Sequence, residues 1–212
     1  WAMKQEIESS DGILIEIANK MINHFERLSS KITTRKYVKE KILYITQCEI
    51  ISEGMDISTN AKVRKIIETL MECTQKLLTH WFGSHIEMSA LEKIVCFYSA
   101  DYAFSFSIKF LEAIINETMD NDIDNLYCKI KIIPYVLTES SKFPNYEKSR
   151  VALSKIPSTL CTPNCVVVLP ETYEILDPQF KRGLQKVYGD LDTKTGSSEV
   201  FYRYSPLSEE ST

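Results

Sequence analysis

The stretch KILYITQCEIIS, residues 41–52, begins as a β-branched, apolar strand and becomes polar at Thr46, Gln47, Cys48 and Glu49 before two isoleucines follow. Its first half has the composition of a strand buried in a sheet. Polar residues where such a strand leaves the core indicate a reactive group, a ligand contact or a turn. The residues on either side of the stretch bear on that choice.

Segments with helical and strand patterns alternate along the chain. Helices are predicted at residues 11–28, 61–81, 101–117, 149–160 and 172–176, where apolar residues recur at helical spacing. Strands are predicted at residues 35–45, 126–137 and 166–169, with hairpins within 85–100 and 185–204. This order predicts an α/β domain in which helices cover a central sheet, with a ferredoxin-like β-α-β-β-α-β core.

The length and charge of the chain limit what it can be. Its 212 residues suffice for one sizeable domain, which we expect over residues 35–204, with a helical lead-in at 1–34 and a flexible tail at 205–212. The net charge is -4 at neutral pH, so no positive field gathers nucleic acid and no nucleic-acid partner is expected.

Apolar runs and cysteines indicate the compartment. The longest uncharged apolar runs, such as residues 94–100, are far shorter than the roughly 20 residues that cross a bilayer. We therefore expect no direct membrane insertion of this segment, although it can belong to a larger, even membrane-anchored, protein. Six scattered cysteines in mostly apolar surroundings are typical of a reducing, cytoplasmic location. Cys161 and Cys165 lack the further ligands that a zinc site needs.

Five phrases, in order along the chain, resemble the catalytic domain of class III adenylate and guanylate cyclases. They are residues 40–52, 83–114, 129–140, 149–176 and 192–204. The first is similar to the opening strand of the family, an apolar run followed by Asp, two apolar residues, Gly, an aromatic residue and Ser or Thr. The resemblance implies a mostly antiparallel sheet flanked by helices. It also implies a reaction in which ATP or GTP is cyclised with two divalent metal ions held by two carboxylates.

The resemblance assigns the metal-binding positions of the family to residues of this chain. The first metal aspartate corresponds to Thr46, and the glycine of the phosphate loop corresponds to Glu49. The second metal aspartate has two possible registers, which place it at Leu91 or at Glu92. A hydroxyl group cannot replace a carboxylate, and Glu92 without an acidic partner would hold a divalent ion weakly.

The remaining positions of the family also differ here. The residue that recognises the base corresponds to Glu87 or Met88, and the asparagine and arginine of the transition state correspond to Val151 and Lys155. Lys155 can meet a phosphate as a point charge but lacks the planar fork of arginine. We therefore expect no catalytic residue, no metal ligand and no cofactor.

The sequence thus predicts an inactive cyclase homology domain, a pseudo-cyclase that works as a regulatory scaffold. Because cyclases of this class build each site across a two-fold interface, the expected partner is a second copy or another cyclase-type domain. Two alternatives stay open. One is a divergent cyclase that converts ATP or GTP with Mg²⁺ or Mn²⁺ held by Glu92 and a ligand from elsewhere. The other is a nucleotide sensor without turnover.

Overall fold

A computed structural model describes residues 41–57, 59–137, 143–191 and 198–206. In these ranges the chain forms a seven-stranded sheet in the order β2-β3-β1-β4-β5-β7-β6. The strands are β1 (Lys41–Ser52), β2 (Ser84–Met88), β3 (Glu92–Phe97), β4 (Leu126–Leu137), β5 (Cys165–Val168), β6 (Gln185–Leu191) and β7 (Ser198–Tyr204). The β4–β5 pair is parallel and the other neighbouring pairs are antiparallel, which confirms the predicted sheet.

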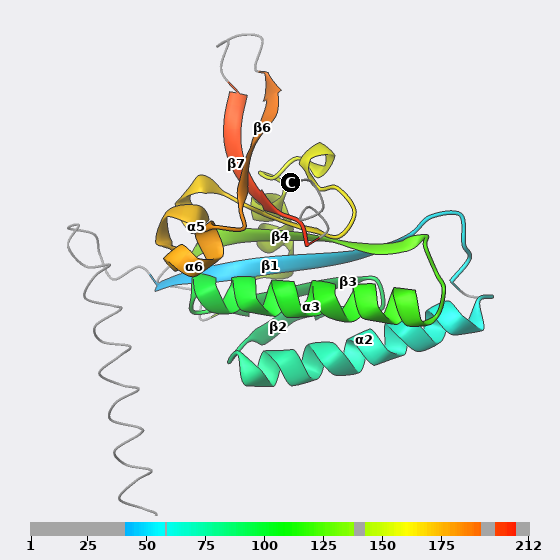
Figure 1. Cartoon of the computed structure of the whole chain (residues 1–212). Helices are drawn as coiled ribbons and strands as arrows, with labels where there is room; N and C mark the ends of the chain where they lie inside the picture. The colour runs from blue at the N-terminus through cyan, green and yellow to red at the C-terminus, as the bar shows by residue number, and fades with distance from the viewer. Residues whose placement is uncertain (1–40, 58, 138–142, 192–197, 207–212) are drawn as a thin grey trace, which may run out of the picture. The chain divides into compact units, whose positions relative to one another are not determined.

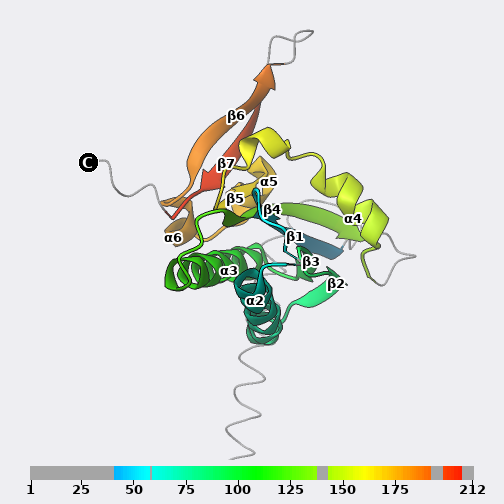
Figure 2. The same ribbon diagram turned by 90° about the vertical axis from the view of Figure 1, so that its right-hand side faces the viewer.

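Helices lie on both faces of this sheet (Figures 1 and 2). They are α2 (Ala61–His80), α3 (Ala100–Asp120), α4 (Tyr146–Leu153), α5 (Pro170–Ile175), α6 (Pro178–Lys181) and the 3-10 turn η1 (Ser158–Leu160). We call the sheet surface packed against α2 and α3 the α2/α3 face, and the surface packed against α4 and η1 the α4 face. None of the helices among the described residues is long and apolar enough to cross a bilayer.

The central strand β1 buries side chains on both faces. Tyr44, Cys48 and Ile50 belong to the apolar cluster beneath α2 and α3, whereas Leu43 and Ile45 belong to the cluster beneath α4. This alternation follows from the strand, in which successive side chains point to opposite faces. The strand is apolar at nearly every position in its first half because both sides are covered.

Two predicted boundaries are wrong for identifiable reasons. The strand predicted to end at residue 45 continues to Ser52, because β4 pairs with it along its whole length and satisfies its backbone. The helix predicted at 149–160 is instead α4, which begins at Tyr146, and the separate turn η1. Asn145 starts α4 early by accepting the N–H groups of Glu147 and Lys148 on its side-chain oxygen. The predicted lead-in, residues 1–34, lies outside the described residues, as do residues 207–212 of the predicted tail.

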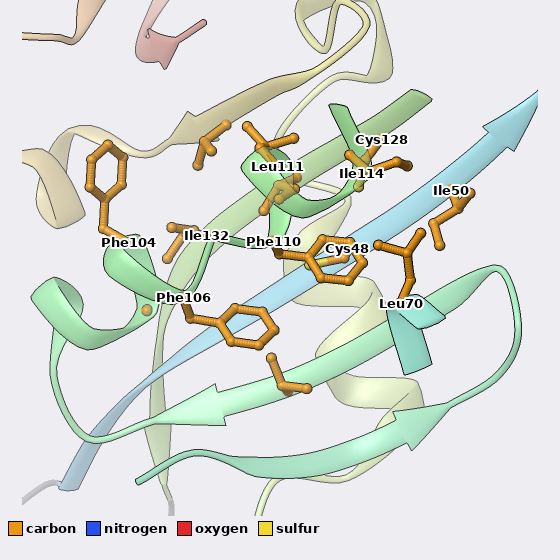
Figure 3. Close-up of a cluster of buried hydrophobic side chains, with 14 of the residues drawn as sticks. Cys48, Ile50, Leu70, Phe104, Phe106, Phe110, Leu111, Ile114, Cys128 and Ile132 are labelled. Atoms are coloured by element: carbon orange, nitrogen blue, oxygen red, sulfur yellow. The ribbon is translucent and has the colours of Figure 1, made fainter. Parts of the chain in front are cut away.

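The α2/α3 face holds the larger core, in which α3 contributes a row of buried aromatic rings (Figure 3). Phe106 lies between two other rings, with its centroid 5.1 Å from that of Phe97 on β3 and 6.1 Å from that of Phe110. Packed side chains of this size dominate the burial of apolar area, so they fix α3 against the sheet.

Gly83, between α2 and β2, allows the closest approach of backbone to this core. A Cβ at this position would overlap the ring of Phe97 and lie 2.7 Å from Cδ2 of Leu78. We therefore expect Gly83→Ala to lower the free energy of unfolding by about 1–3 kcal/mol, measured by urea titration. Because the clash involves the ring, the same substitution should cost less in a Phe97→Leu background. Equal costs in the two backgrounds would contradict this explanation.

Candidate functional site

Charged and amide side chains form a polar row across three strands of the α4 face. We define this polar row as Gln47 and Glu49 of β1, Glu92 of β3, and Lys129 and Lys131 of β4. Glu49 is paired with Glu92 on one side and with Lys129 on the other, and Gln47 is paired with Lys131. Residues directly opposite each other in an antiparallel ladder share a face, with Cβ atoms about 4.5–5.5 Å apart. The five side chains are therefore neighbours.

Glu92 is the most fully contacted member of the polar row. Its Oε1 accepts a hydrogen bond from Nε2 of Gln47 at 2.5 Å, and its Oε2 accepts one from the hydroxyl of Tyr146 at 3.4 Å. Arg150, one turn further along α4, donates to the Tyr146 hydroxyl at 3.4 Å and lies over its ring. Both carboxylate oxygens thus hold neutral donors, and together these contacts connect α4 to β1 and β3.

The two lysines of the polar row have separate contacts. Lys131 is buried, and its ammonium donates to the carbonyl of Ile156 at 2.9 Å, in the segment between α4 and η1. Lys129 lies over the ring of Tyr127, with Nζ 5.7 Å from the centroid. The Tyr127 hydroxyl donates to Glu53, and this hydrogen bond raises the pKa of Tyr127 to about 12. The ammonium groups of both lysines therefore have contacts of their own, Lys131 with a backbone carbonyl and Lys129 with an aromatic ring.

Thr46 lies on the opposite side of the sheet from Glu92. It falls between Tyr44 and Cys48, which both face α2 and α3, and it is fully buried. Its hydroxyl has no hydrogen-bond partner in the structure. The residue of β1 that meets Glu92 is Gln47, which the sequence comparison did not select. Residues two apart on a strand share a face, so Gln47 follows from Ile45 once the face of Ile45 is known.

The hairpin between β2 and β3 separates the two registers proposed for the second metal position. Leu91 lies in the exposed turn, where its carbonyl accepts the N–H of Ile50 at 2.7 Å. Glu92 begins β3, and of the two residues Leu91 and Glu92 it is the one that belongs to the polar row. Glu87 is paired with Ile94, a residue of the α4 cluster, so Glu87 also lies on the α4 face, whereas Met88 packs in the α2/α3 cluster.

The two predicted transition-state positions are not brought to the polar row. Val151 is 72% exposed on α4, and Lys155 is exposed beyond the end of that helix. The residue of α4 that contacts Glu92 is instead Tyr146, to whose hydroxyl Arg150 donates. Within the described ranges, no three His, Cys, Asp or Glu side chains are arranged to hold a metal ion.

Comparison with known proteins identifies the fold. No family model matches the chain, and no curated protein does. Among solved structures, the guanylyl cyclase Cya2 is similar at a TM-score of 0.55 and 14% sequence identity, and the match covers 78% of this chain and 92% of the Cya2 chain. An adenylate cyclase from Trypanosoma brucei is similar at a TM-score of 0.57 and 10% sequence identity, and the match covers 81% of this chain and 92% of that one. The adenylyl cyclase CyaB from P. aeruginosa is similar at a TM-score of 0.55 and 13% sequence identity, and the match covers 82% of this chain and 98% of that one. The described chain therefore has the fold of the class III adenylate and guanylate cyclase domain.

Proposed function

We propose that this domain is a pseudo-cyclase, which retains the cyclase fold without the reaction and associates with itself or with another domain of the same fold. The observation that supports this most directly is the state of Glu92. A two-metal mechanism needs a pair of carboxylates free to bind divalent ions. Here the β1 side chain that contacts Glu92 is an amide, Gln47, and both oxygens of Glu92 accept hydrogen bonds, while the carboxylate opposite Glu92, Glu49, is paired on its other side with Lys129. The residues present do not fit a two-metal site.

The cations nearby also argue against metal binding. Lys129 and Lys131 lie on the same face as Glu49 and Glu92, so the row carries as many positive as negative side chains. Positive charge on these lysines would repel a divalent cation bound to the carboxylates of the row.

Activity and metal binding test the absence of catalysis. The purified chain with ATP or GTP and Mg²⁺ or Mn²⁺ is expected to form no cyclic nucleotide above a protein-free blank, with an active cyclase domain as positive control. Gln47→Asp replaces the amide that contacts Glu92 with a carboxylate and should increase the affinity for Mn²⁺, measured by calorimetry. Gln47→Asn, which changes length without adding charge, is the matched control and should not. Cyclic nucleotide made by the wild type and lost in Glu92→Gln would overturn the proposal.

Association is tested by the mass of the species in solution. The supporting comparison is that one solved structure of this fold is described as a non-canonical dimeric guanylyl cyclase domain, at 13% identity and a TM-score of 0.53. We expect sedimentation to show a concentration-dependent dimer, or a complex when an active cyclase domain is added. A chain that stays monomeric under both conditions would refute the scaffold role.

A second candidate function rests on Glu49. It is directly opposite Glu92 and supplies a second carboxylate, so a divergent cyclase or nucleotide sensor would place Mg²⁺ or Mn²⁺ between these two residues. Solved structures of this fold include one in complex with GTP, at 15% identity and a TM-score of 0.54. Binding to the native state raises stability. A higher melting temperature with millimolar GTP or ATP and metal, abolished in Glu49→Gln, would favour this candidate.

A further inference from the structure

A pair of thiols lies beside the polar row, at the start of β5. Cys161 and Cys165 enclose the turn that leads from η1 into β5 and interact with each other, and the Cys161 thiol donates to the carbonyl of Pro157 at 3.8 Å. Both belong to the apolar cluster of the α4 face. Asn164, in the left-handed region with φ of 52°, turns the chain, and its side-chain oxygen accepts the N–H of Cys128 at 3.0 Å. The turn is therefore anchored to β4.

Basic residues stand on the strands to either side of Cys165, on its face of the sheet. Lys129 is paired with Cys165 across the parallel β4–β5 ladder, and Lys131 follows two residues later on the same face. On the other side, Arg203 of β7 is paired with Val167, which shares a face with Cys165. Positive charge near a thiol favours the thiolate, which is the nucleophilic form. Glu49, opposite Lys129, is the nearest acidic member of the row.

The two thiols differ in their ionisation. The interaction with the Cys161 side chain lowers the pKa of Cys165, and Thr162 and the charge of Arg203 act in the same direction against the effect of burial. The pKa of Cys161 is raised, first by that interaction and then by burial. Of the two thiols, Cys165 is therefore the one whose ionisation is favoured.

We propose that Cys165 is an oxidation site, at which hydrogen peroxide forms a sulfenic acid that Cys161 converts into an intramolecular disulfide. The Cys165 thiolate attacks one peroxide oxygen, so an S–O bond forms, the O–O bond breaks and hydroxide leaves. The sulfur is oxidised by two electrons and the peroxide is reduced. The Cys161 sulfur then attacks the Cys165 sulfur, the S–O bond breaks, and hydroxide leaves with the Cys161 proton as water.

The same fold contains a second thiol pair that serves as an internal comparison. Cys48 and Cys128 also interact and are buried, but on the α2/α3 face, beneath the long helix α3, and the Cys128 thiol donates to the carbonyl of Lys129 at 3.7 Å. Burial raises the pKa of Cys128 well above its usual value. The turn over Cys161 and Cys165 is short and has exposed residues at Thr162 and Pro163, so a local opening admits peroxide there more readily.

Comparing Cys73 with Cys165 tests whether solvent exposure or thiolate character decides which cysteine reacts first. It lies on α2 and is half-buried, so it is more accessible than Cys165, which is fully buried. Burial raises the pKa of Cys73, because the charge of Lys76 only partly offsets it. If thiolate character decides reactivity, Cys165 reacts before Cys73; if exposure decides it, the order is reversed.

Graded hydrogen peroxide on the full chain tests the proposal, followed by alkylation in denaturant and mass spectrometry of the peptides. At low peroxide the 161–165 peptide should lose two hydrogens and escape alkylation, while Cys73, Cys48 and Cys128 are alkylated, and dithiothreitol should reverse the loss. Oxidation of Cys73 or of the Cys48–Cys128 pair at lower peroxide than Cys165 would overturn the proposal.

Variants assign the two roles. Cys161→Ser should leave a sulfenic acid on Cys165 that dimedone traps, and Cys165→Ser should leave Cys161 reduced. Arg203→Gln should slow the oxidation of Cys165 several-fold without abolishing it. If the thiols served only in packing, the substitution would leave this rate unchanged. Should either cysteine variant fail to fold, the order of reaction in the wild type and the rate in Arg203→Gln still decide the outcome. An unchanged rate in Arg203→Gln counts against the charged environment as the cause.

Discussion

Replacing Phe110 with alanine should lower the free energy of unfolding by about 3–5 kcal/mol. The ring is fully buried on α3, stacks near-parallel on Phe106 with an interplanar angle of 9°, and lies 5.7 Å from Nζ of Lys93 (Figure 3). Truncation leaves a cavity between α3 and the sheet, which side chains fixed in both elements cannot fill. Urea unfolding followed by circular dichroism measures the loss.

Met119 supplies the control on the same helix. It is 75% exposed near the end of α3, so Met119→Ala should change the free energy of unfolding by no more than about 0.5 kcal/mol. Phe110→Leu keeps most of the apolar volume and should fall between the two. A cost for Phe110→Ala as small as that for Met119→Ala would mean that α3 is not fixed by this ring.

The sequence predicts β1 as a strand but not which of its polar residues faces the site. Residues 42–45 are apolar at every position, so no alternation indicates which of the polar residues at 46–49 face which side of the sheet. A slip of one residue moves a side chain to the other face of a strand. Matching the family phrase placed Thr46 at the metal position, whereas the structure puts Gln47 beside Glu92.

Contacts between distant segments explain the other differences. Tyr146 approaches Glu92 because Asn145 starts α4 three residues before the apolar pattern does. Cys48 and Cys128 meet only because β1 and β4 are neighbours. Glu92, by contrast, was among the predicted positions, since a turn followed by an apolar strand is a local pattern. Local signals therefore located the elements, while pairing across the sheet decided which side chains meet.

Lys93 is the other buried group that the sequence does not reveal, because it stands between Glu92 and an apolar run. Its side chain is fully buried on the α2/α3 face, paired with Cys48. Its ammonium donates to the carbonyls of Ala90 at 3.1 Å and Ser89 at 3.5 Å, and neither partner carries a charge. Burial accordingly lowers the pKa of Lys93.

We expect Lys93→Met to raise the free energy of unfolding at pH 7 by about 1–4 kcal/mol, because it removes a buried charge and keeps an unbranched apolar side chain. The two carbonyls lie in the exposed hairpin turn, where water can replace the ammonium. The exposed residue Lys65 is the control, and Lys65→Met should stay within about 0.5 kcal/mol of the wild type.

The pH dependence distinguishes a desolvated charge from a packing effect. The pKa of Lys93 in the folded chain lies below its ordinary value of 10.5, so the unfolded chain binds more protons between those two values. The destabilisation by Lys93 is fully present below the folded pKa and is lost as the pH rises towards 10.5. Urea titrations of both proteins should therefore show the advantage of Lys93→Met shrinking over that range, with the raised pKa values of Tyr44 and Tyr127 affecting both alike. An advantage that stays constant with pH would assign it to packing instead.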